Sequence, residues 1–152
     1  MKWLLRIVFV AIAAFGLWQV WQRVFVTDET RIRRQISVMV SATEKGDVLR
    51  LSDALAADYS DDWGLDKSML IGAVRSFRSQ YDALFIHLSD LIVTIDPDHQ
   101  KAQAVFIAKI IAKAKGSLSE SEIRADRFRL YFRKSDSGWK LTRAESPELK
   151  FE

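Results

Sequence analysis

The sequence predicts an α+β domain in which three helices pack on one face of an antiparallel sheet of about four strands, behind an N-terminal transmembrane helix. Three observations predict this. Apolar residues recur at helical spacing up to about residue 80, the later segments have the length and composition of β-strands, and residues 3–26 are almost wholly apolar. We therefore divide the chain into a signal-anchor, residues 1–27, and one domain, residues 28–152.

The segment Trp3–Val26 has the length and composition of a membrane-spanning helix, because about 20 apolar residues cross a bilayer. Tryptophan stands near both ends of the segment, at Trp3 and again at Trp18 and Trp21, as in an aromatic belt. Few polar residues interrupt it, namely Arg6, Gln19, Gln22 and Arg23.

A cleavable signal peptide and an interfacial helix are the alternatives for this segment. Lys2 and Arg6 precede the apolar run as in a signal peptide, but small residues lie inside the run and its end, residues 18–21, is too bulky for signal peptidase. We expect an uncleaved single-pass anchor. Its short leading tail places the domain outside the cytoplasm, in the periplasm or its equivalent, although the arginines at 23, 31, 33 and 34 oppose this under the positive-inside rule.

The composition excludes several classes of function. The absence of cysteine rules out disulfides, thiol catalysis and cysteine-ligated metals. The pI of about 9.3 suggests nucleic acid, but three of the 23 basic residues, Lys2, Arg6 and Arg23, belong to the anchor, so the remaining chain balances its 20 acidic residues. We predict a membrane partner and no nucleic-acid partner. Charge is segregated all the same, acidic in residues 44–100 and basic in residues 101–152.

Three helices are predicted before residue 80. Capping side chains, apolar residues at helical spacing and a glycine stop mark their ends. We expect Leu55 and Ala56 to lie on the apolar side of the second helix. The expected boundaries are Asp28 and Gly46 for the first helix, Asp47 for the start of the second and Asp66 for the start of the third.

Four strands are predicted after Tyr81, where the apolar period changes. Turn signals at residues 97–100 and 135–138 and a polar loop at residues 116–122 separate them. The expected strands are residues 84–95, 102–114, 123–134 and 139–145.

Three short stretches resemble the nuclear-transport-factor-2-like superfamily, the cystatin-like cone fold that includes ketosteroid isomerase-like and polyketide cyclase-like proteins. Glu44–Asp47 resembles the turn between its first two helices, Asp58–Lys67 the loop into its third helix, and Trp139–Glu145 its last strand. The resemblance covers residues 29–146. It implies a curved sheet wrapped around the helices, with a cavity at the wide end of the cone, and it implies fold rather than function.

A small-molecule site is expected inside this cone. One face of the second strand carries five alanines between residues 102 and 114, which leaves space under the helices unless larger side chains fill it. An ordinary packed core is the alternative. An apolar ligand would contact the aromatic side chains near the cavity, which we predict to be Tyr59, Trp63, Phe106, Phe128 and Trp139.

Catalytic residues are less evident. His87 is a candidate acid or base if simple alternation points it into the cone, whereas a bulge near residues 89–90 would turn it to solvent. Tyr59, with Asp61 or Asp62, is the other candidate set. The tyrosine and paired aspartates of ketosteroid isomerases have no match, since residues 32–43 contain no tyrosine.

No metal and no cofactor are predicted. The aspartates of residues 58–66 suggest calcium, but an EF-hand needs glycine where this chain has Trp63 and a bidentate carboxylate where it has Met69.

The opposite face of the sheet carries apolar and basic residues together. The three interpretations are a solvated charged face, a protein interface, and a surface for anionic headgroups or nucleic acid. The residues concerned are Val105, Ile107, Lys109, Ile111 and Lys113 on one strand and Arg127, Arg129 and Tyr131 on its neighbour.

The sequence thus favours a membrane-anchored, non-catalytic domain. It would serve as an interaction or accessory subunit of a membrane or envelope complex, contacting a protein partner or a second copy through the sheet, with an apolar ligand in the cone as an option. The alternative is an isomerase, dehydratase or cyclase that works in the cone.

Overall fold

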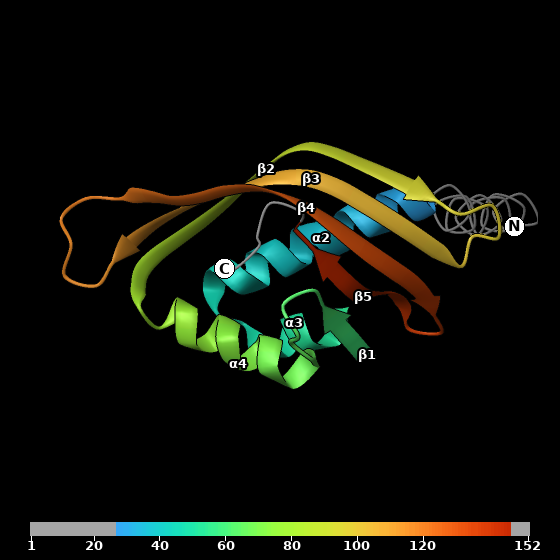
Figure 1. Ribbon diagram of the computed structural model, residues 1–152, viewed down its shortest axis with the longest axis horizontal. Coiled ribbons are helices and arrows are strands. Elements are labelled where there is room, and N and C mark those ends of the chain that lie inside the picture. The colour runs from blue at the N-terminus through green and yellow to red at the C-terminus, as the bar shows by residue number, and fades with distance from the viewer. Residues whose placement is uncertain (1–26, 147–152) are drawn as a thin grey trace, which may run out of the picture.

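The computed structural model describes residues 27–146, without the side chains of residues 122–125. The predicted anchor, Trp3–Val26, lies outside the described residues. Within them, no helix has both the length and the apolar character needed to cross a bilayer. Residues 27–146 form three helices and a five-stranded sheet, and the sheet arches over the helices, which all lie on its inner face (Figure 1). The predicted α+β class is confirmed.

The three helices begin at the expected residues, because each start has a side-chain cap. α2 (Asp28–Lys45) follows Thr27, whose hydroxyl accepts from the Thr30 N–H at 3.2 Å. Gly46 ends α2 in the left-handed conformation, at φ 72°. The carboxylate of Asp47 caps α3 (Val48–Ala54), and that of Asp66 caps α4 (Lys67–Arg78).

The sheet has one strand more than predicted. The segment β1 (Leu55–Asp61), which begins with the two residues assigned above to the second helix, pairs in parallel with the last strand, Leu55 beside Leu141 and Asp61 beside Ala144. The prediction of a helix through Leu55 and Ala56 was therefore wrong. A short apolar run fits either element, and here pairing satisfies the outer backbone groups of the last strand.

The other strands agree with the predicted segments to within three residues. They are β2 (Tyr81–Ile95), β3 (Lys101–Ala114), β4 (Ser121–Ser135) and β5 (Gly138–Glu145). The order across the sheet is β1-β5-β4-β3-β2, and all neighbours except β1 and β5 are antiparallel. The sheet is therefore mixed rather than purely antiparallel.

A β-bulge in β2 decides which side chains face the helices. The register between β2 and β3 shifts between Ser89 and Ile92, and Asp90 adopts a φ of 55°. Ile86 before the bulge and Leu91 after it both pack against the core, although they are an odd number of residues apart. The bulge thus keeps the apolar side of β2 inward along its length.

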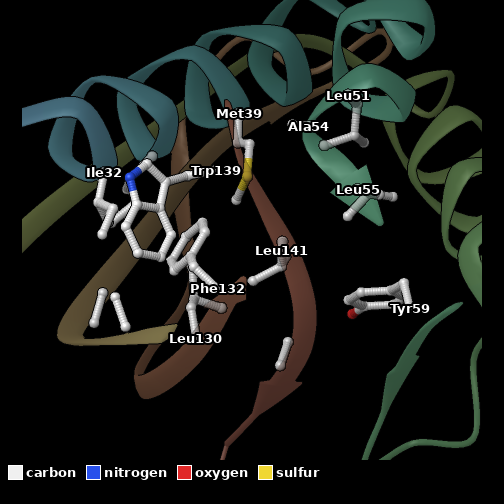
Figure 2. Close-up of a cluster of buried hydrophobic side chains, with 14 of the residues drawn as sticks. Ile32, Met39, Leu51, Ala54, Leu55, Tyr59, Leu130, Phe132, Trp139 and Leu141 are labelled. Carbon is white, nitrogen blue, oxygen red and sulfur yellow. The ribbon is translucent and has the colours of Figure 1, made fainter. Parts of the chain in front are cut away.

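The core lies between α2 and the inner face of the sheet. Figure 2 shows the Trp139 indole beneath α2, beside Phe132 and Ile32, with Met39 farther along the helix. Phe132 is only 1% exposed. The small residues of the inner face of β3, Ala102, Ala104, Ala108 and Ala112, are all buried, as the face assignment from sequence predicts.

Candidate functional site

An apolar cavity of about 230 Å³ lies inside the cone, between the helices and β4–β5. Each helix contributes side chains to its wall, among them Val40 of α2, Leu51 of α3 and Val74 of α4. The volume is larger than the roughly 150 Å³ apolar cavity that holds benzene and smaller than the roughly 300 Å³ at which ordinary ligand pockets begin. The cavity suits a molecule of one or two rings.

Two of the described residues that line this cavity carry a hydroxyl group, Thr43 and Tyr59, and Tyr59 was predicted from the sequence. The residue is 3% exposed, and its hydroxyl donates to Asp61 Oδ2 at 3.2 Å. Burial, and secondarily the Asp61 carboxylate, raises the pKa of Tyr59 far above its ordinary value of 10.0. Tyr59 is therefore a hydrogen-bond donor at all physiological pH values and not a proton acceptor.

Asp61 is committed to holding its loop. Its Oδ1 accepts from the backbone N–H of Trp63 at 3.0 Å and of Leu65 at 2.8 Å, while Oδ2 accepts from Tyr59. Both oxygens of the Asp61 carboxylate are therefore engaged by groups of its own loop and strand. The hydrogen bond between Tyr59 and Asp61 thus has a structural role in the cavity wall, and neither side chain is free to transfer a proton.

Trp63 lines the cavity and leaves one polar atom without a protein partner. Its indole Nε1 is buried and has no hydrogen-bond acceptor among the described residues. The ring packs edge-on against Phe128, at a centroid separation of 6.4 Å. A buried N–H without an acceptor costs about 1–3 kcal/mol, so an acceptor atom from a ligand or a water would be favourable there.

The predicted cavity residues divide into two groups. Tyr59, Trp63 and Phe128 line the cavity. Phe106 lies behind Phe128, with ring centroids 6.0 Å apart, and does not line it. Trp139 belongs to the other end of the cone, where its Nε1 donates to Asp28 Oδ1 at 3.3 Å. The prediction that Trp139 contacts a ligand in the cavity was therefore wrong. Trp139 is a core residue that links α2 to the sheet.

His87 faces away from the cone. It is exposed and stands opposite Lys109 of β3, on the outer face of the sheet. This is the outcome expected from a bulge at residues 89–90, and the bulge is present. His87 therefore cannot act as an acid or base inside the cavity, and the register that would point it inward is not the one found.

The four clustered aspartates each have a different structural partner. Asp58 binds Arg133 through two hydrogen bonds of 2.6 and 3.0 Å, and Asp62 binds Arg143 at 2.6 Å. Asp66 caps α4. Their separate contacts explain the loop without an ion, and in the described part of the chain no three acidic or histidine side chains are placed to hold one.

The outer sheet face carries the predicted mixture of apolar and basic side chains. On β3, residues 105, 107, 109, 111 and 113 alternate with the buried alanines and so point outward. Arg127 and Arg129 of β4 stand opposite Ile107 and Val105 in the register. Tyr131 donates to Glu145 Oε2 at 3.1 Å. No described helix covers this face (Figure 1).

The arrangement of three helices against the inner face of a curved five-stranded sheet matches many solved structures. One is a protein described as nuclear-transport-factor-2-like with a cystatin-like fold from Novosphingobium aromaticivorans, at a TM-score of 0.66 and 18% identity over 84% of this chain and 86% of that one. The chain has the nuclear-transport-factor-2-like fold. The predicted resemblance is thereby confirmed at the level of fold.

Two further structures with this fold illustrate its range. A superfamily member from Salmonella enterica aligns at a TM-score of 0.68 and 11% identity, over 82% of this chain and 92% of that one. A candidate scytalone dehydratase from Novosphingobium aromaticivorans aligns at 0.69 and 12%, over 78% and 81%. The sequence matches no protein-family profile and no curated protein. At these identities the nuclear-transport-factor-2-like fold is shared and the function is open.

Several cavity residues were not singled out from the sequence. Leu70 and Val74 of α4 and Ile86 of β2 line the cavity. The apolar spacing of α4 places its residues on the inner side, but only the bulge in β2 places Ile86 there. The helical period was a usable signal for the first two residues, whereas the third needed the strand register.

Proposed function

We propose that this chain is a membrane-anchored, non-catalytic domain that binds a partner protein through the outer face of its sheet, as an accessory subunit of a membrane complex. The observation that carries the proposal is the uncovered outer face, where apolar side chains lie among cations. Large apolar side chains are exposed on its β2 edge, Phe85 at 52% and Ile92 at 64%. Ile107 and Ile111 of β3 are half-buried beside them.

The chemistry of this face indicates the kind of partner. Phe85 stands opposite Ile111, and Ile92 opposite Val105, so the apolar residues form a strip along β2 and β3. Arg127 and Arg129 flank the strip on β4. A complementary surface would carry apolar residues bordered by carboxylates.

A second copy of the chain fits this face less well. In a two-fold symmetric interface the same surface is used by both copies. Packing two such faces together would bring the cations of both copies into one interface, and like charges in a desolvated interface are strongly unfavourable. We therefore favour a different protein, with a homodimer as an outcome for the experiment to detect.

The anchor supports the same proposal. An apolar segment of the length of Trp3–Val26 would confine the domain to a membrane surface, and we propose the extracytoplasmic side of that membrane. Two-dimensional confinement raises the effective concentration of a domain relative to membrane partners, which suits an interaction module. Protease accessibility in spheroplasts tests the side of the membrane.

Charge reversal on the outer face tests the proposed interface. Arg127→Glu with Arg129→Glu should abolish co-purification of the partner from solubilised native membranes. A matched control, Arg34→Glu with Arg50→Glu, makes the same change of charge on exposed helix positions and should leave it intact. Equal recovery of the same protein with both double variants would refute the interface, and so would recovery of the wild-type chain as an isolated monomer.

The second candidate is a function of the cone. The cavity of about 230 Å³ and the buried Trp63 Nε1 favour a small apolar molecule with one hydrogen-bond acceptor. The isomerase, dehydratase or cyclase form of this candidate lacks a free base, because Asp61 is held by its loop and His87 points outward. Binding without turnover is therefore the form that the geometry favours.

Fluorobenzene is a suitable probe of the cone. We expect ¹⁹F NMR to detect its binding to the wild-type chain, and Val74→Trp to abolish it by filling the cavity. Leu49→Trp, at a position 77% exposed on α3, is the control and should bind as the wild type does. If fluorobenzene binds neither the wild-type chain nor either variant, the proposal of a ligand site in the cone is wrong.

A further inference from the structure

Four basic residues converge on one groove at the end of the domain far from Asp28. The groove has a volume of about 300 Å³. It lies where the C-terminal ends of α2 and α4 meet the start of β2 and the end of β3, and no aspartate or glutamate lines it. The basic residues are Lys45, Arg75, Arg78 and Lys115.

Backbone contacts fix this convergence. Arg78 Nε donates to the carbonyl of Glu44 at 2.7 Å, and its Nη1 donates to the carbonyl of Tyr81 at 2.5 Å. The N–H of Lys115 donates to the carbonyl of Gln80 at 3.2 Å. Three segments distant in sequence, residues 44–46, residues 75–81 and Lys115, are thus held together, so the groove is built by the fold and not by one flexible loop.

Some cations of the domain pair with carboxylates, whereas in the described part of the chain those of this groove do not. Arg133 pairs with Asp58, Arg143 with Asp62, and Arg50 with Asp47. By contrast, none of the groove's four cations has a carboxylate within ion-pair distance among residues 27–146. Like charges gathered at one place repel each other, and an anion would relieve that repulsion.

Helix dipoles account for only part of the cluster. Lys45 lies in the last turn of α2, and Arg75 and Arg78 lie in the last turn of α4, where cations are favourable. Lys115 follows β3 and has no such role. Arg78 uses two of its five N–H donors on backbone carbonyls, which leaves three for a ligand.

We propose that this groove binds a small, multiply charged phosphate anion. Lysine and arginine are the side chains that bind phosphate oxygens, arginine through its fork of donors and lysine as a point charge. The volume lies at the lower limit of ordinary ligand sites, so the anion is small. This site is separate from the outer sheet face and stands whether or not that face binds a protein.

The position of the groove favours a soluble anion over a lipid headgroup. The 18 residues of α2 span about 27 Å and separate the groove from Asp28, where the proposed anchor joins the domain. Headgroups of the anchoring membrane would lie at the Asp28 end.

Calorimetric titration of the full chain in uncharged detergent tests the site, with inorganic pyrophosphate as the probe. The triple variant Lys45→Gln, Arg75→Gln, Lys115→Gln should lose at least tenfold in affinity, which corresponds to about 1.4 kcal/mol. The control triple variant, Arg34→Gln, Arg50→Gln, Lys101→Gln, removes the same charge from exposed positions outside the groove and should bind as the wild type does. Arg78 is left intact because it holds the backbone together.

A charge-conserving variant and a lipid headgroup complete the test. The variant Lys45→Arg, Arg75→Lys, Lys115→Arg should keep its affinity, which separates loss of charge from loss of folding. Glycerophosphoglycerol, the soluble headgroup of an anionic lipid, should bind more weakly than pyrophosphate. The proposal is overturned if pyrophosphate does not bind, if both triple glutamine variants bind it equally well, or if the headgroup binds more tightly.

Discussion

Replacing Asp28 with asparagine should destabilise the domain through a carboxylate that joins three other parts of the fold. Asp28 accepts hydrogen bonds from Trp139 Nε1 and Lys134 Nζ, both at 3.3 Å, and from His99 Nδ1 at 3.2 Å. Hydrogen bonds to a charged group contribute about 1.5–3 kcal/mol, and the exposure of the lysine and histidine reduces their share. We expect Asp28→Asn to lower the free energy of unfolding by about 1–2 kcal/mol at pH 7.

The same carboxylate predicts how that difference changes with pH. Burial alone would raise the pKa of Asp28, but the hydrogen bonds from Trp139, Lys134 and His99 hold it below its ordinary value of 3.8. A depressed carboxyl pKa stabilises the fold above the unfolded value, and this contribution is lost as the pH falls through the folded one. The difference between wild type and Asp28→Asn should therefore shrink as the pH falls below 3.8 towards the lower pKa of the folded state.

Urea unfolding of the full chain in uncharged detergent, followed by tryptophan fluorescence at several pH values, measures this difference. Asp136→Asn removes a carboxylate from the exposed turn between β4 and β5 and should change the free energy of unfolding by less than about 0.5 kcal/mol. Two results would refute the reasoning. One is an unchanged stability of Asp28→Asn at pH 7, and the other is a difference that does not shrink as the carboxylate is protonated.

Two further substitutions test the backbone and the cavity wall. Gly46→Ala should cost about 2 kcal/mol, because φ is 72° and the new Cβ would lie 3.1 Å from Arg78 Cγ, whereas Gly64→Ala, at φ 77° with open space around it, should cost about 1 kcal/mol. Equal losses in denaturant unfolding would exclude the Arg78 contact. Tyr59→Phe should cost about 1 kcal/mol by removing the hydrogen bond to Asp61, and an unchanged melting temperature would contradict that contact.

The sequence could predict those parts of the fold that local chemistry decides. Caps at Asp47 and Asp66 and the left-handed stop at Gly46 mark the helices, because each satisfies backbone groups within a few residues. The alternation of alanines with larger residues on β3 likewise fixed its inner face. These signals need no knowledge of distant segments.

Features that depend on distant partners could not be predicted in the same way. β1 is a strand because β5 lies beside it, and nothing within residues 55–61 favours a strand decisively over a helix. Trp139 is an obvious core residue, but its distance from the cavity follows from its hydrogen bond to Asp28, which is 111 residues earlier. The sequence allowed β2 either to alternate regularly or to contain a bulge near residues 89–90, and the direction of the His87 side chain depends on which occurs.

The basic groove illustrates the same limit on the scale of a site. Lys45 and Arg75 lie in the half of the chain that is acidic overall, and Lys115 lies in the basic half. Counting charge along the sequence therefore does not show that these basic side chains lie close together in the fold. Only the packing of two helix ends against β2 and β3 brings these side chains to one groove.

Photo-crosslinking in native membranes tests the central claim most directly. A benzophenone amino acid placed at Ile107, in the middle of the outer sheet face, should give one discrete adduct with another protein. The same group at Leu49, which is 77% exposed on α3, should give none. Adducts of equal yield from both positions, or none from Ile107 while the chain remains monomeric, would contradict the proposal that this face binds a partner.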